Sequence, residues 1–145
     1  HTKKKTITRA LLDLFIWKST DSGATWDPTA APAQLWYAVS TTADGSRVVA
    51  AAGATAGVGG GLYISNNGGS SFALAPSPVP NGNANLQSAA ISSSGSIVAC
   101  AVNGAAMYVS RDGGSTFAVP SGQPSGNWKS VAVSGDGSTV YGVIQ

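Results

Sequence analysis

Several residue types on which common catalytic and metal sites depend are scarce in this sequence. Among its 145 residues there is one cysteine, one histidine and no glutamate. One cysteine cannot form a disulfide within the chain, and one cysteine with one histidine cannot build a zinc site. The histidine is His1, so no serine–histidine–aspartate triad is expected. Cys100 lies in the apolar run 97–101 and is expected to be a buried core residue.

Charge is also scarce, and no hydrophobic run is long. Charged residues make up 10% of the chain, and four of the eight basic residues lie among the first nine positions. From residue 14 onward four basic residues accompany five aspartates, so this part is close to neutral. A neutral body without a basic stripe argues against nucleic acid, and no apolar run approaches the ~20 residues that span a bilayer. We expect no nucleic-acid partner, no membrane partner, no cofactor and no metal.

Glycine is abundant, with 19 residues, and short apolar runs are separated by Gly, Asn and Ser. This composition predicts an all-β chain with many turns. A pattern of the form Ser-x-Asp-x-Gly-x-Thr-Trp occurs three times, at 19–26, 65–72 and 110–117, with spacings of 46 and 45 residues. We call these three stretches the box segments. A period of this length indicates a repeat architecture.

The box segments share four positions, and in one of them Asn replaces Asp. The shared residues are Ser19, Asp21, Gly23 and Trp26, then Ser65, Asn67, Gly69 and Phe72, and finally Ser110, Asp112, Gly114 and Phe117. The pattern resembles the Asp-box, or BNR, repeat of sialidase-like and related β-propellers. Glycine supplies the positive φ of a tight turn, the Asp or Asn side chain bonds backbone amides, and the aromatic residue packs over the hairpin. The resemblance implies a structural role for these residues and a secreted or extracytoplasmic location.

A second repeated unit lies at 36–50, 86–99 and 128–141. Each copy predicts two short strands joined by an Asp-Gly or Ser-Gly turn. With the box hairpin this makes four strands per ~45 residues, which is the blade of a β-propeller. Residues 1–13 match no repeat and form a separate N-terminal segment. Residues 14–145 are predicted to hold three blade-equivalents of four antiparallel strands, permuted within a blade.

Three blades are too few for a closed ring, because propellers usually have four to eight. In a first hypothesis, which we favour, two chains form a homodimer that closes a six-bladed ring. The strands of 128–145 in one chain would pair with the hairpin 14–28 of the other, so that twofold symmetry covers the exposed strand edges. In a second hypothesis the chain is a fragment of a longer propeller.

The enzyme activities that the resemblance suggests lack their residues here. Sialidases use three arginines, a Tyr–Glu pair and an aspartate, whereas this chain has no glutamate, and Arg47 and Arg111 lie in or beside turns. The repeats also resemble those of xyloglucan-active glycosidases and photosystem-assembly-type propellers. Such glycosidases require two aspartates as acid and base. Only Asp13 and Asp27 lie outside repeat-equivalent turns, so we predict no catalytic residue in this chain.

Ligand binding is the remaining kind of activity, and its best candidates lie beside the predicted blade-to-blade loops. Trp36 and Trp128 begin inner strands and could stack on a sugar ring, while Tyr37 and Asn83 could add polar contacts. In the alternative interpretation both tryptophans pack between neighbouring blades as core residues.

Three functions stay open at this point. The first is a non-catalytic β-propeller binding or interaction module whose ligand is a glycan or a protein. The second is a fragment of a larger Asp-box glycoside hydrolase whose catalytic residues lie on other blades. The third is a purely structural repeat assembly.

Overall fold

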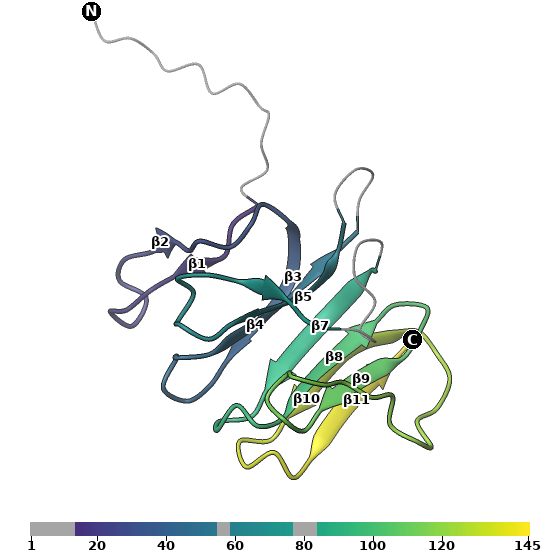
Figure 1. Cartoon of the computed structure of the whole chain (residues 1–145). Helices are drawn as coiled ribbons and strands as arrows, with labels where there is room; N and C mark the ends of the chain where they lie inside the picture. Colours follow the sequence, from purple (N-terminus) through teal and green to yellow (C-terminus); the bar gives the residue numbers. More distant parts are fainter. Residues whose placement is uncertain (1–13, 55–58, 77–83) are drawn as a thin grey trace, which may run out of the picture.

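The computed structural model describes residues 14–54, 59–76 and 84–145 (Figure 1). Within these ranges the chain forms eleven β-strands and no helix. The strands are β1 Trp17–Lys18, β2 Asp27–Pro28, β3 Leu35–Thr41, β4 Val48–Gly53, β5 Gly61–Ser65, β6 Ala73–Leu74, β7 Leu86–Ile91, β8 Val98–Val102, β9 Met107–Ser110, β10 Trp128–Val133 and β11 Val140–Ile144. A search of the described residues found no helix of the length and hydrophobicity that a membrane crossing requires.

The strands form four antiparallel sheets that follow one another along the chain. Strands β3 to β6 make a four-stranded sheet and β7 to β9 a three-stranded one, which a bridge between Val109 and Ala118 extends by one segment. The pairs β1–β2 and β10–β11 make two-stranded sheets at either end. The prediction of an all-β chain of antiparallel sheets is confirmed, and one of the described sheets has the four strands expected of a blade. Figure 1 shows the sheets fanned out in chain order, with β7 between β4 and β10.

The first two strands of each complete sheet make the contacts between neighbouring sheets. Strand β7 contacts β3 and β4 on one side and β10 on the other. Every residue of β8 is buried, and so is every residue of β4 after the first. Because both faces of these strands are covered, their sequences are continuously apolar and do not alternate between apolar and polar residues. Small residues such as Ala50, Ala51 and Ala101, none with exposed surface, let the sheets approach closely.

Larger side chains fill the space between the second and third sheets. Leu62, Leu86 and Val98 belong to this cluster and are fully buried. Cys100 lies in the same cluster, and its burial raises the pKa of the thiol to about 12. The thiol is therefore protonated and unreactive at neutral pH. The prediction that Cys100 is a core residue is confirmed.

Candidate functional site

Each box segment is a turn held by its own side chains. The Asp112 Oδ1 accepts hydrogen bonds from the Ser110 hydroxyl at 2.7 Å and the Thr116 amide at 2.8 Å, and Oδ2 accepts the Thr116 hydroxyl at 2.6 Å. The Ser110 Oγ accepts the Gly114 amide at 2.7 Å. Gly113 and Gly114 have φ values of 71° and 90°, which glycine adopts readily. Both carboxylate oxygens of Asp112 are therefore occupied within the turn.

The other two box segments repeat these contacts with one chemical change. The Asp21 Oδ1 accepts the Thr25 amide at 2.8 Å. In the middle segment the Asn67 Oδ1 accepts the Ser71 amide at 2.9 Å, and its Nδ2 donates to the Ser71 hydroxyl at 2.8 Å. Asparagine thus keeps the turn without a negative charge. Because the negative charge is dispensable at this position, the role of the Asp or Asn side chain is to hold the turn by hydrogen bonds.

The turns between the first two strands of each unit are braced in a similar way. The Asp44 Oδ1 accepts the Thr42 hydroxyl at 2.7 Å and the Ser46 amide at 3.0 Å. The Asp136 Oδ1 accepts the Ser134 hydroxyl at 2.6 Å and the Ser138 amide at 3.0 Å. In the third sheet a serine at position 94 takes this place, and its hydroxyl lies 2.9 Å from that of Ser96.

Hydrogen bonding lowers the pKa of all four turn aspartates to about 2. The largest cause in each case is a side-chain hydroxyl that donates to the carboxylate. These donors are Thr25 for Asp21, Thr42 for Asp44, Thr116 for Asp112 and Ser134 for Asp136. A glycosidase acid needs a raised pKa so that it holds a proton near neutral pH. These four carboxylates have the opposite property.

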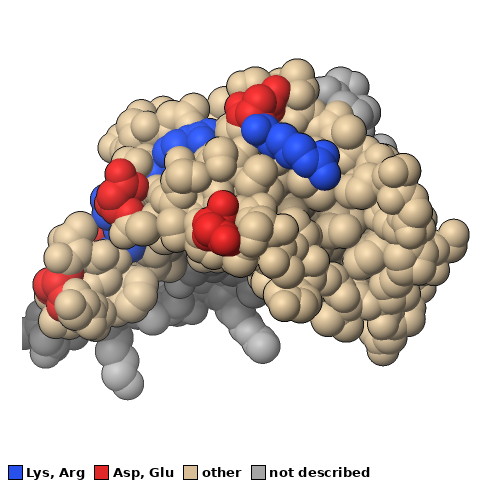
Figure 2. Space-filling view, turned by 90° about the horizontal axis from the view of Figure 1, so that it is seen from below, with Lys and Arg blue, Asp and Glu red and all other residues tan. Residues whose placement is uncertain are grey.

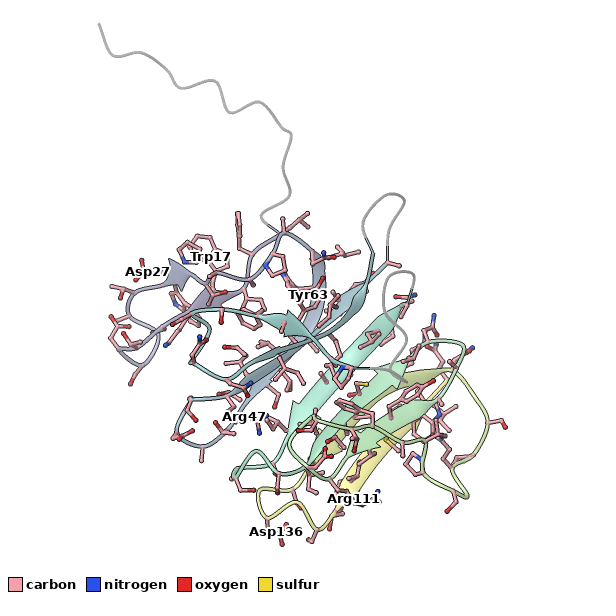
Figure 3. All side chains as sticks on the ribbon, in the orientation of Figure 1. Trp17, Asp27, Arg47, Tyr63, Arg111 and Asp136 are labelled. Atoms are coloured by element: carbon pink, nitrogen blue, oxygen red, sulfur yellow. The ribbon has the colours of Figure 1, made fainter. Side chains whose placement is uncertain are left out.

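The two aspartates outside the repeated turns were the remaining candidates for catalysis. Asp27 is exposed on β2, opposite Lys18 in the register. Figure 3 shows Asp27 and Asp136 at opposite ends of the described structure, so these two do not form a pair. Asp13 lies outside the described residues. Among the described carboxylates, the four turn aspartates thus lack the raised pKa of a glycosidase acid, and Asp27 lies far from Asp136.

Arg47 makes a contact between sheets that sequence reasoning missed. Its Nη1 donates to the Gly95 carbonyl at 2.6 Å, its Nη2 donates to the Gly113 carbonyl, and its Nε donates to the Asn66 Oδ1 at 2.8 Å. The guanidinium thus joins the second sheet to two turns of the third. Lys18 makes a simpler version of this contact, because its Nζ donates to the Gly68 carbonyl at 3.0 Å.

Most of the charged groups lie on the side of the molecule that carries these turns. Figure 3 shows Arg47, Arg111 and Asp136 toward this side, and Figure 2 views the molecule from it. Acidic and basic side chains are interspersed there, and the described part of this face carries no large patch of one sign. On this face Asp44, Asp112 and Asp136 brace turns, and Arg47 joins two sheets.

The aromatic residues proposed for ligand binding lie at the other ends of the inner strands. Trp36 is half-buried, its Nε1 donates to the Leu14 carbonyl at 3.0 Å, and its ring meets that of Tyr63 edge-on at 5.1 Å between centroids. Trp128 is buried, and its ring lies directly over Gly142. Both tryptophans therefore take part in packing. Asn83 lies outside the described residues, and the ligand role of all these residues stays a prediction.

A β-bulge recurs at the same place in all three inner strands. The pairing register shifts between Trp36 and Ala38 in β3, between Leu86 and Ser88 in β7, and between Trp128 and Ser130 in β10. The extra residue in each bulge is Tyr37, Gln87 or Lys129. We call these three residues the bulge row. A bulge turns one side chain away from the regular pleat, and bulges are common next to binding sites.

The side chains of the bulge row are accessible and chemically varied. The ring of Tyr37 rests against Gly53 and is 49% exposed. Gln87 and Lys129 are half-buried. The Gln87 Nε2 donates to the Asn85 Oδ1 at 2.8 Å, and the Lys129 Nζ donates to the Asn103 Oδ1 at 3.1 Å.

The two asparagines link these contacts into one network. The Asn103 amide donates to the Asn85 carbonyl at 2.9 Å, so amide groups and an ammonium group run from β7 to β10. A hollow of about 380 Å³ is lined by residues 104–106, which directly follow Asn103 in the chain, and by residues 123–127. The Gln123 Oε1 accepts the Met107 amide at 3.0 Å and so anchors one wall. This end of the sheets therefore combines an exposed ring, polar side chains and a concave surface.

Sequence reasoning found Tyr37 but missed Gln87 and Lys129. The sequence did hold a signal, because each of these residues directly follows a large residue at the start of an inner strand. This signal was overlooked because the three side chains, an aromatic ring, an amide and an ammonium group, have no chemical property in common. The bulge that makes the positions equivalent depends on strand pairing, which the residue pattern does not record.

Comparison with known proteins identifies the architecture. No protein-family model and no curated protein matches the sequence. Among solved structures, a GH74 enzyme from Niastella koreensis superposes with a TM-score of 0.67 and 27% sequence identity, over 90% of this chain and 22% of that chain. An ancestral GH74 enzyme gives a TM-score of 0.66 and 23% identity, over 90% and 19%. The chain thus spans about a fifth of the length of these structures.

The fold is a section of a β-propeller. The superposition covers nine-tenths of the chain, and the sheets described above are its blades. The bulge row and the hollow therefore lie on the blade face that carries the loops between blades, whereas the box segments lie at the opposite face.

Proposed function

We propose that this chain is a non-catalytic, carbohydrate-contacting section of a GH74-type glycoside hydrolase propeller. The observation that carries the proposal is the likeness to the Niastella koreensis GH74 enzyme, at 27% identity over 90% of the chain. Because the chain corresponds to 22% of that protein, the catalytic residues belong on other blades.

The chemistry of the described carboxylates supports a non-catalytic role. Four of the five described aspartates have a pKa near 2 and brace turns. The fifth, Asp27, is exposed on β2 without a second carboxylate opposite it in the register. Hydrolysis of a glycosidic bond requires two carboxyl groups that flank the bond. The section therefore contributes binding surface rather than reacting groups.

The bulge row supports a carbohydrate as the ligand. A sugar presents hydroxyl groups and flat C–H faces, so it is recognised by polar side chains together with aromatic rings. Tyr37 offers a half-exposed ring. Gln87, Asn85, Asn103 and Lys129 offer donors and acceptors at the same end of the inner strands. The row crosses three neighbouring inner strands, which suits an extended chain of sugars better than a single one.

Isothermal titration calorimetry with soluble xyloglucan oligosaccharides tests this proposal. The wild-type chain is expected to bind, and Tyr37→Ala or Gln87→Ala is expected to weaken binding about tenfold, a loss of ~1.4 kcal/mol. Arg111→Gln, on the turn face, is the matched control and is expected to bind as the wild type does.

Three results would contradict the proposal. Affinity that does not change in Tyr37→Ala and Gln87→Ala would remove the bulge row from the site. Release of reducing sugars by the purified chain would show that it carries its own catalytic groups. A wild-type chain that binds no oligosaccharide would favour a purely structural role.

A further inference from the structure

Asparagine is followed directly by glycine three times in the sequence. Asn67–Gly68 belongs to the second box segment, and Asn103–Gly104 forms the turn between β8 and β9. The third pair, Asn81–Gly82, lies outside the described residues. An asparagine in this position can lose its side-chain amide, because glycine has no side chain to hinder its own nitrogen when that nitrogen attacks the asparagine Cγ. Since the two described pairs share this dipeptide, the fold decides how they differ in reactivity.

Hydrogen bonds protect the Asn67–Gly68 pair. The Gly68 amide donates to the Ser46 carbonyl at 2.7 Å, so the attacking nitrogen is already engaged. The side chain of Asn67 is held at both of its polar atoms, because Oδ1 accepts the Ser71 amide at 2.9 Å and Nδ2 donates to the Ser71 hydroxyl at 2.8 Å. Attack on Cγ requires these bonds to break first. The pair therefore serves as an unreactive reference within the same chain.

The nitrogen of Gly104 is open to solvent and unoccupied. The turn is closed by the Ala105 amide, which donates to the Val102 carbonyl at 3.2 Å, and among the described residues the Gly104 amide has no hydrogen-bond partner. Gly104 is exposed, and a Cβ built on it would meet no atom within 4 Å. Solvent can therefore remove the amide proton, and there is space for the five-membered ring that attack on Asn103 creates.

A cation lies beside the carbonyl group that would be attacked. The Lys129 Nζ donates to the Asn103 Oδ1 at 3.1 Å. This oxygen gains negative charge when a nucleophile adds to Cγ, and a positive donor already in place stabilises that charge. The corresponding oxygen of Asn67 accepts only neutral donors, the Ser65 hydroxyl at 3.0 Å and the Ser71 amide at 2.9 Å. Asn103 thus combines a free nucleophile with an activated carbonyl.

The charge of Lys129 is not neutralised by a neighbouring carboxylate. Among the described residues no aspartate makes an ion pair with it, and its Nζ contacts the amide oxygen of Asn103 instead. Asp136 lies in the turn that follows β10, beyond Val133. A strand rises about 3.3 Å per residue, so Val133 is already about 13 Å from Lys129. This exceeds the ~8 Å over which exposed charges act at physiological salt, so the ammonium acts on Asn103 with its full charge.

We propose that Asn103 is a site of deamidation, promoted by the ammonium group of Lys129. The Gly104 nitrogen loses its proton to water and forms a bond to the Asn103 Cγ. The bond from Cγ to Nδ2 then breaks, and the amide nitrogen takes up a proton and leaves as ammonia. Water opens the resulting succinimide at one of its two carbonyl carbons and produces aspartate or isoaspartate. One water enters and one ammonia leaves, so the reaction requires no oxidant, reductant or cofactor.

The product changes the charge at this end of β10. When the ring opens to aspartate, a carboxylate takes the place of the amide that Lys129 contacts, and the two groups form a charge-assisted hydrogen bond. The backbone bond from the Asn103 amide to the Asn85 carbonyl is kept, because it does not involve the side chain. Deamidation therefore neutralises the one charged member of the bulge row and leaves the strand pairing in place.

Peptide mapping by mass spectrometry tests the proposal on the full chain, incubated in mildly alkaline buffer made with water labelled with heavy oxygen. Asn103 is expected to exchange its NH₂ for a labelled oxygen at least about tenfold faster than Asn67, a difference of ~1.4 kcal/mol in activation free energy. In the chain unfolded by urea the two rates are expected to become similar, because the fold no longer distinguishes the two pairs. Equal rates in the folded chain, or faster conversion of Asn67, overturn the proposal.

Lys129→Met tests the role of the ammonium group, because it removes the charge and keeps a long side chain. Conversion of Asn103 is expected to slow about tenfold, while that of Asn67 stays unchanged. Arg111→Gln, which removes a cation from the turn face, is the matched control and is expected to leave both rates as in the wild type. An unchanged rate at Asn103 in Lys129→Met overturns the promotion by Lys129, and the comparison within the wild-type chain holds even if this variant fails to fold. Because these readouts involve no sugar, they can fail independently of the proposed carbohydrate function.

Discussion

Arg47 offers a direct measure of how strongly neighbouring blades hold together. Its guanidinium donates to the carbonyls of Gly95 and Gly113 and to the side chain of Asn66, across a sequence separation of up to 66 residues. Arg47→Ala removes all three bonds and leaves two carbonyl groups at the junction of the blades. A hydrogen bond from a charged donor contributes about 1.5–3 kcal/mol. Because Arg47 is only half-buried and water replaces part of what is lost, we expect a total loss of about 2 kcal/mol.

Thermal unfolding followed by circular dichroism measures this loss. For a chain of this length it corresponds to a decrease in Tm of about 4–8 °C. Protein concentration is held constant, since association makes Tm concentration-dependent. The loss should persist in 1 M NaCl, because the acceptors are neutral carbonyl and amide oxygens rather than carboxylates. Arg111→Ala, on the exposed box turn, is the control. A Tm for Arg47→Ala within 1 °C of the wild type would refute the idea that this side chain joins the blades.

Three further predictions concern the turns. Asp112→Asn should lower Tm less than Asp112→Ala, because Asn67 already makes the equivalent bonds with an amide. Folding lowers the pKa of the turn carboxylates from 3.8 to about 2. Their contribution to stability is therefore complete above pH 3.8 and disappears as the pH falls through 2. Thermal unfolding measured at pH 4, 3 and 2 tests this expectation. Gly137→Ala should destabilise more than Gly104→Ala in the same assay. Both have φ near 75°, but only at Gly137 would the new Cβ lie 2.6 Å from the Ile97 side chain.

The sequence predicts those parts of the fold that local chemistry decides. Serine, aspartate and glycine at fixed spacing specify the box turn, because all of its hydrogen bonds join residues within four positions of one another. The four strands of a blade follow from the apolar runs between these turns. The low exposure of Cys100 follows from the apolar run around it.

The parts that the sequence did not predict depend on contacts between distant segments. Arg47 looked like a turn residue in the sequence. Its acceptors at Gly95 and Gly113 are backbone carbonyls, which every residue has, so the residue types at these positions do not reveal the contact. The bulge at Gln87 arises from the pairing of β7 with β8. The packing of Trp128 over Gly142 likewise depends on pairing between β10 and β11.

Comparison of equivalent positions in the repeats of one chain distinguishes residues that stabilise the fold from residues that are available for binding. At the braced turns the backbone geometry and the residue chemistry repeat together, because hydroxyl, carboxylate or amide groups are needed to hold the turn. In the bulge row only the backbone repeats, and its side chains are an aromatic ring, an amide and an ammonium group. A position that keeps its geometry while its chemistry changes is under no common packing demand. Its side chains are free to match the successive parts of a ligand, which is why we propose binding at the bulge row rather than at the box segments from which the fold was predicted.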